Sequence, residues 1–178
     1  MSINNVGSGI ANTEEIKFSL LDYDNQIMVQ NSVSQIIITS VNSSTSSVAG
    51  TNSKQMKSGV ATFDNLIAIS APGSSNVKFK ASSKAISNSK IIGAFGSSIS
   101  NNTISFNFRD CKPGEYILDN TCVECSAGSF SLEWNSIECT SCLENAVCLG
   151  KDQISVRSGY WRRTTNSTKL IECINQDA

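Results

Sequence analysis

The cysteines carry the clearest chemical signal in this sequence. Residues 122–142 read CVECSAGSFSLEWNSIECTSC, in which 13 residues separate two Cys-x-x-Cys pairs. Four thiolates in such an arrangement can hold a zinc ion in a tetrahedral site, whose ligands would be Cys122, Cys125, Cys139 and Cys142. The same pairs can instead belong to a set of disulfides. A zinc site indicates a reducing compartment, whereas disulfides indicate an oxidising one.

Three observations favour disulfides over zinc. Three further cysteines, Cys111, Cys148 and Cys173, flank the four and would have no role in a zinc site. The surrounding sequence is poor in aliphatic residues and needs covalent staples to stay folded. The chain also contains Asn-x-Ser/Thr sequons, which suit a glycosylated exterior. The candidate acceptors are Asn42, Asn101 and Asn166.

The composition argues against several classes of function. The 178 residues carry a net charge of −1, and only 16% of them are charged, so the chain lacks the dense basic surface that nucleic acids attract. It contains no histidine, the residue on which most general-base and catalytic-zinc sites depend. We therefore expect no enzymatic activity and no cofactor. No run of 18 apolar residues is present that would cross a membrane.

Apolar and polar residues alternate along several short segments before the first cysteine. Period-two alternation buries one face of a strand, so we expect strands at residues 16–22, 76–82 and 102–108. Short runs rich in β-forming residues predict two more strands, at residues 35–39 and 59–63. The sequence therefore predicts an all-β fold, an antiparallel β-sandwich over residues 1–108 followed by a disulfide-rich, loop-dominated module over residues 109–178. The serine-rich tract 40–58 is expected to be a mobile loop.

Residues 10–108 are similar to the immunoglobulin-like repeats of bacterial adhesins and to filamin-type repeats. An Asp-x-x-Asn turn at Asp22–Asn25 follows an early strand, and a late strand begins with Gly59, Ala61 and Phe63. A Pro-Gly turn stands at residues 72–73. The resemblance implies an immunoglobulin-like sandwich.

Residues 111–142 resemble the cysteine-rich repeat of ephrin-receptor-like and growth-factor-receptor-like ectodomains. The matching positions, in order, are Cys111, Pro113, Gly114, Tyr116, Cys122, Cys125, Gly128, Phe130, Ser131, Cys139 and Cys142. This resemblance implies sequential disulfides, Cys111–Cys122 and Cys125–Cys139, and extends to Cys142–Cys148. Cys173 is left without a partner inside the chain.

Residues 144–163 are similar to a segment that follows such repeats in large surface proteins of ciliates and other protists. The matching positions are Cys148, Gly150, Ile154, Val156, Gly159, Tyr160, Trp161 and Arg162. The N-terminus has neither the basic region nor the apolar region of a secretory signal. We therefore expect the chain to be a piece of a longer protein, with the cysteine-rich module truncated at its C-terminal end.

Two further groups of residues have competing interpretations. Asp22, Asp24 and Asn25 could contribute oxygens to a calcium site, but these residue types also favour a simple turn, which is the interpretation we prefer. The stretch Tyr160, Trp161, Arg162 and Arg163 has the composition of an interface hot spot. Alternatively, one aromatic ring covers a disulfide while the arginines are solvated, and this second interpretation is the one we favour.

Together these observations predict a non-enzymatic extracellular segment of a cell-surface protein with a structural or adhesive role. Its partners would be other extracellular proteins or neighbouring domains of the same parent chain, and any membrane anchor would lie outside residues 1–178. One alternative is the ligand-binding ectodomain of a surface receptor. A second alternative is an intracellular adaptor that binds zinc.

Overall fold

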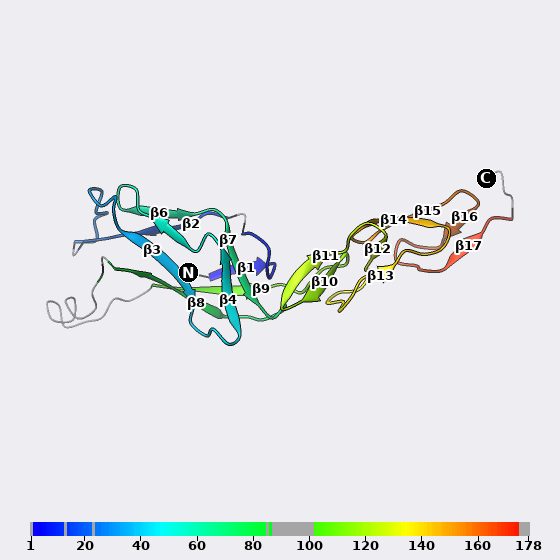
Figure 1. Cartoon of the computed structure of the whole chain (residues 1–178), viewed down its shortest axis with the longest axis horizontal. Helices are drawn as coiled ribbons and strands as arrows, with labels where there is room; N and C mark the ends of the chain where they lie inside the picture. The colour runs from blue at the N-terminus through cyan, green and yellow to red at the C-terminus, as the bar shows by residue number, and fades with distance from the viewer. Residues whose placement is uncertain (1, 13, 23, 85, 87–101, 175–178) are drawn as a thin grey trace. The chain divides into compact units, whose positions relative to one another are not determined.

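The chain divides into two compact units, Met1–Arg109 and Asp110–Ala178 (Figure 1). This computed structural model describes residues 2–12, 14–22, 24–84, 86 and 102–174. Every regular element within these ranges is a strand, so the all-β prediction is confirmed. The boundary falls between residues 109 and 110. The sequence predicted it one residue earlier, between residues 108 and 109.

A five-stranded sheet forms the larger part of unit 1. Its strands are, in spatial order, β1 (Ser2–Val6), β9 (Thr103–Phe108), β8 (Val77–Ser83), β3 (Gln35–Ser40) and β5 (Ser53–Gln55). β1 pairs with β9 in parallel, and the other neighbours are antiparallel. The sheet is curled into a half-barrel.

Two strand pairs contain the other strands that the structure describes in unit 1. They are β2 (Ile16–Ser19) with β6 (Val60–Phe63), and β4 (Ser46–Gly50) with β7 (Leu66–Ser70). The segment after β1 also bonds to β7, because Gly9 N–H donates to the Ala68 carbonyl at 3.0 Å and Asn12 N–H donates to the Leu66 carbonyl at 3.0 Å. The N-terminal segment therefore pairs with both the sheet and the strand pair β4–β7.

The core of unit 1 is formed by the alternating apolar residues of these strands. In β9 every second residue, Ile104, Phe106 and Phe108, is buried, as the period of a strand requires. The Phe106 ring packs edge-on against Phe79 with their centroids 5.1 Å apart. Residues of the five-stranded sheet and of both strand pairs belong to this one core, so they bury their apolar faces against one another.

The expectation of a loop over residues 40–58 is wrong, because β4 and β5 lie within it. The serines of β4 do not alternate with apolar residues, but its backbone pairs with β7 along its whole length. Ser46 is buried, and its hydroxyl lies 2.6 Å from the Ser40 hydroxyl and 3.1 Å from the Asn42 carbonyl oxygen. Hydrogen bonds therefore order part of the serine-rich tract, although its sequence shows no alternation of apolar and polar residues.

The described part of unit 2, residues 110–174, contains four consecutive hairpins, seen from yellow-green to red in Figure 1. Hairpin 1 is β10 (Glu115–Leu118) with β11 (Thr121–Glu124), hairpin 2 is β12 (Ser129–Phe130) with β13 (Thr140–Ser141), hairpin 3 is β14 (Ala146–Gly150) with β15 (Gln153–Val156), and hairpin 4 is β16 (Tyr160–Arg162) with β17 (Leu170–Glu172). The small apolar core of the unit is a cluster of Phe130, Ala146, Cys148 and Ile154.

Replacement of a core aromatic residue in unit 1 tests whether the two cores are separate. We expect Phe106→Ala to lower the free energy of unfolding of unit 1 by about 3–5 kcal/mol, because it leaves a cavity in the centre of the sheet. Hydrogen exchange followed by mass spectrometry reports each unit separately. Amides of unit 1 should exchange faster while those of unit 2 are unchanged. The matched control Val33→Ala alters a side chain that is 84% exposed and should change neither unit. Equal loss of protection in both units would contradict the division.

Candidate functional site

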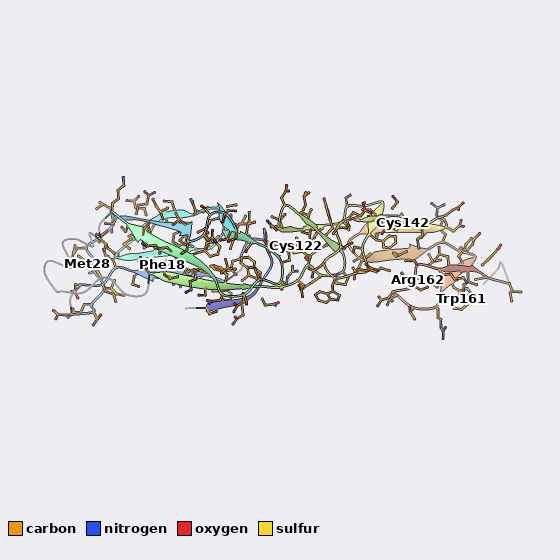
Figure 2. The ribbon with its side chains drawn as sticks, turned by 90° about the horizontal axis from the view of Figure 1, so that it is seen from below. Phe18, Met28, Cys122, Cys142, Trp161 and Arg162 are labelled. Carbon is orange, nitrogen blue, oxygen red and sulfur yellow. A yellow bond between two sulfur atoms is a disulfide. The ribbon has the colours of Figure 1, made fainter. Side chains whose placement is uncertain are left out.

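Three disulfides fasten the hairpins of unit 2. They join Cys111 to Cys122, Cys125 to Cys139, and Cys142 to Cys148, with Cα–Cα distances of 5.3, 5.7 and 5.5 Å. These are the pairs that the resemblance to ephrin-receptor-like repeats implies. Cys122 and Cys142 mark the two ends of this region in Figure 2. Four of the bridged cysteines, Cys111, Cys122, Cys125 and Cys148, are buried, so the sulfurs supply part of the interior of the unit.

The structure does not assemble the zinc site considered from the sequence. Cys122, Cys125, Cys139 and Cys142 belong to three different disulfides, and a sulfur atom within a disulfide is not the thiolate that zinc requires. Glu115 lies beside the first disulfide, with potential ligand atoms of Cys111, Glu115 and Cys122 within 4.8 Å of one another. Its carboxylate oxygen Oε2 accepts a hydrogen bond from Lys112 N–H at 2.9 Å, which indicates a structural role in the turn.

A tight turn at Lys112–Glu115 brings hairpin 1 against hairpin 3. Gly114 has a φ of 89°, and Pro113 precedes it, as is typical of a type II turn. The Gly114 N–H donates to the Ser131 carbonyl at 2.8 Å, and the Gly114 carbonyl accepts from Cys125 N–H at 2.9 Å. A Cβ atom at this position would lie 2.9 Å from the backbone nitrogen of Asp152. The turn therefore has room only for glycine.

An ion pair joins hairpins 1 and 3 on the surface. Lys151 Nζ lies 2.9 Å from Glu124 Oε1, and both side chains are more than half exposed. The hydrogen bond and charge of Glu124 raise the pKa of Lys151. Because solvent screens exposed charges, we assign this pair a small part in stability.

Tyr160, Trp161 and Arg162 form strand β16, and Arg163 follows it. Trp161 and Arg163 are exposed, whereas Tyr160 and Arg162 are half-buried. Trp161 is 48% exposed and faces Ile171 across the hairpin, and Arg162 Nη1 donates to the Thr165 carbonyl at 2.7 Å. Neither Tyr160 nor Trp161 belongs to the apolar cluster that contains Cys148. The structure thus gives no support to the interpretation that one of these rings covers a disulfide. Trp161 and Arg162 are labelled in Figure 2.

Asn166 lies in the loop of hairpin 4, and the remaining sequence candidates come from other segments of the chain. Asp22 Oδ1 accepts hydrogen bonds from the backbone N–H groups of Asp24 at 3.0 Å and Gln26 at 2.9 Å, and Asn25 has a φ of 60°. This is the pattern of a turn, the preferred interpretation of that segment. Asn42 and Asn166 are exposed, as glycosylation acceptors must be. Asn101 lies outside the described residues. All seven cysteines are described, and Cys173 alone is outside a disulfide.

Sequence reasoning missed an apolar patch on unit 1. Leu21, Ile27, Met28, Val29 and Val33 are all more than 40% exposed and lie in the connection between β2 and β3. Leu21 and Ile27 form a bridge at the base of this connection. Figure 2 shows Met28 at the end of this unit. The signal that could have revealed the patch is the run Ile27-Met28-Val29, which interrupts a segment otherwise typical of a turn.

No helix that could span a membrane occurs among the residues that the structure describes. Comparisons with models of protein families, with curated protein sequences and with solved structures found no match to this chain.

Two alanine substitutions test the packing of the Gly114 turn. Gly114 and Gly128 have the same φ of 89°, but a Cβ at Gly128 would meet no atom within 4 Å. Both substitutions strain the backbone by about 1–2 kcal/mol. We expect Gly114→Ala to lower the free energy of unfolding by about a further 1–3 kcal/mol, because the new methyl group overlaps the Lys151–Asp152 backbone. Guanidinium denaturation of the disulfide-intact protein measures both variants, and equal losses would contradict the close contact.

Proposed function

We propose that this chain is a non-enzymatic, extracellular structural or adhesive segment of a cell-surface protein. The observation that carries the proposal is the presence of three disulfides in a unit whose apolar core is small. Disulfides persist in oxidising compartments and are rare in the cytosol. The three disulfides are consistent with an extracellular or secreted location.

Unit 1 is proposed to be an immunoglobulin-like sandwich that acts as a rigid spacer. Three features of its topology support this assignment. The antiparallel neighbours β3, β8 and β9 correspond in order to the C, F and G strands of such a domain. The pair β2–β6 supplies the expected B and E strands, and the residues of both groups meet in one core.

Unit 2 is proposed to be a cysteine-rich module of the ephrin-receptor-like and growth-factor-receptor-like kind. Its Pro113-Gly114 turn, its buried Phe130 and its sequential disulfides support this assignment. The disulfides would keep the module folded outside the cell, where no cytosolic chaperone can rescue it. In this account the module extends the spacer and presents its exposed side chains to other proteins.

A receptor ectodomain that binds a specific ligand is the alternative function. The observation that favours it is the exposure of Trp161 beside Arg162, since tryptophan and arginine are enriched in binding hot spots. The apolar patch of unit 1 offers a second surface of this kind. Under this alternative the surface protein would transmit a signal when the ligand binds.

Antibody staining of the cells that make the protein tests the proposed location. An antibody raised against the folded chain should stain intact cells as strongly as permeabilised cells, because the epitope lies outside the membrane. The matched control is an antibody against a cytosolic protein, which should stain only permeabilised cells. Staining of the chain that also requires permeabilisation would overturn the proposed function.

A further inference from the structure

The connection between β3 and β4 holds the sequon Asn42-Ser43-Ser44 in an ordered turn. The side-chain oxygen Oδ1 of Asn42 accepts hydrogen bonds from the Ser44 N–H at 3.3 Å and from the Ser44 hydroxyl at 2.7 Å. The backbone carbonyl of Asn42 accepts from the N–H groups of Thr45 at 3.2 Å and Ser46 at 3.0 Å. An asparagine whose side-chain oxygen binds the backbone two residues later forms an Asx turn. The turn therefore brings the asparagine and the serine of the sequon into direct contact.

This turn depends on local contacts. The hydrogen bonds that Asn42 makes with described residues reach Ser40, Ser44, Thr45 and Ser46, all within four residues of it. Local hydrogen bonds of this kind form without the rest of a sheet, because only a short loop has to close. The turn can therefore form while the chain is still entering the secretory pathway, before the sheet of unit 1 is complete.

The amide nitrogen of Asn42 is open to reaction. A backbone N–H can only donate, so the side-chain atom of Asn42 that faces the Ser44 N–H must be the oxygen. The nitrogen Nδ2, on the other arm of the amide, is then directed away from Ser44. Asn42 is exposed, and Nδ2 has no hydrogen-bond partner within the part of the chain that the structure describes. The sequon thus presents a free acceptor nitrogen to solvent.

A hollow beside Asn42 suits the first sugar of a glycan. It has a volume of about 290 Å³, and its lining includes the apolar side chains of Val41 and Val77 and the polar side chains of Asn76 and Lys78. Val41 is 58% exposed. Small-ligand sites combine apolar walls with a few polar groups and begin at about 300 Å³. The hollow is therefore of a size and character that fit a single sugar ring.

The other sequon that the structure describes has a different local geometry. Asn166 is exposed, but none of the described hydrogen bonds joins it to Thr168. Ser167, between them, donates its hydroxyl to the Lys169 carbonyl at 3.3 Å instead. Of these two sequons, the one at Asn42 is therefore the one whose asparagine and serine are held together.

We propose that Asn42 carries an N-linked glycan whose innermost sugar occupies this hollow and covers Val41 and Val77. In the transfer step, Nδ2 of Asn42 forms a bond to C1 of a sugar carried by a polyprenyl pyrophosphate. The bond from C1 to the pyrophosphate oxygen breaks, the pyrophosphate leaves with the electron pair, and Nδ2 gives up one proton. The proposal rests on the extracellular function, because this transfer takes place in the secretory pathway.

The first test asks whether Asn42 is modified. The full chain, with Asn101→Gln and Asn166→Gln so that Asn42 is the single acceptor, is secreted from a eukaryotic host. Peptide N-glycosidase in heavy-oxygen water then converts a glycosylated asparagine to a labelled aspartate, which peptide mapping locates. We expect the label at residue 42. Ser44→Thr should preserve it, because threonine also completes a sequon, and the matched variant Ser44→Ala should abolish it.

The second test asks whether the first sugar lies in the hollow. An endoglycosidase trims the glycan to one sugar, and the same polypeptide made in a bacterial periplasm carries none. Hydrogen exchange at increasing temperature should show unit 1 unfolding about 4 °C higher with the single sugar, because the sugar shields apolar surface. Val41→Ala should remove most of this difference. The matched control Val33→Ala, at a valine that is 84% exposed and does not line the hollow, should preserve it.

The outcomes separate this proposal from the proposed function. An unmodified Asn42 in a secreted chain with its three disulfides intact would overturn the glycan and leave the extracellular assignment standing. Equal unfolding temperatures with and without the single sugar would overturn the placement of that sugar in the hollow. The same mapping is applied to protein from the cells that make it. Free thiols there at the six bridged cysteines would contradict the proposed function itself.

Discussion

Unit 2 cannot fold on its apolar core alone, and the rest of its structure follows from that constraint. Its buried cluster consists of Phe130, Ala146, Cys148 and Ile154, and one of these residues is itself half of a disulfide. Chains that bury so little apolar surface need covalent staples to offset the conformational entropy lost on folding. Each disulfide restricts the unfolded chain, by about 3 kcal/mol for a loop near 15 residues in the chain-entropy model. The tight turns then place successive hairpins close enough for the staples to form.

The sequence predicted the parts of the fold that depend on regular patterns. Alternation located β2, β8 and β9, and short runs of β-forming residues located β3 and β6. The resemblance around Pro113 and Gly114 implied the disulfide pairs that the structure contains. The sequence did not predict β4, because the serines of this strand pair through their backbone and do not alternate with apolar residues. The repetition of the hairpins was also hidden, since Asn145 adopts the left-handed conformation usually left to glycine. The apolar patch of unit 1 escaped notice because it lies in a connection, where no period is expected.

Under the proposed function, the two units would have different roles. Unit 1 has a large core of aromatic and aliphatic residues and owes its fold to burial, so it needs no cysteine. Disulfides and tight turns stabilise unit 2. Further hairpins of this kind can therefore be added in series, provided that each one carries a disulfide. In this account the first unit is a rigid spacer and the second a stalk whose length depends on the number of hairpins. Exposed side chains such as Met28 and Trp161 are then available to partners.

Disulfides, and not a zinc ion or the apolar core, hold unit 2 together. The most direct test is the intact mass of the protein made in a eukaryotic secretory host, measured before and after reduction, with zinc determined in the same sample. We predict a gain of about six hydrogens on reduction, two for each disulfide, and no zinc. An unchanged mass with one zinc ion per chain would contradict the account and place CVECSAGSFSLEWNSIECTSC in a metal site.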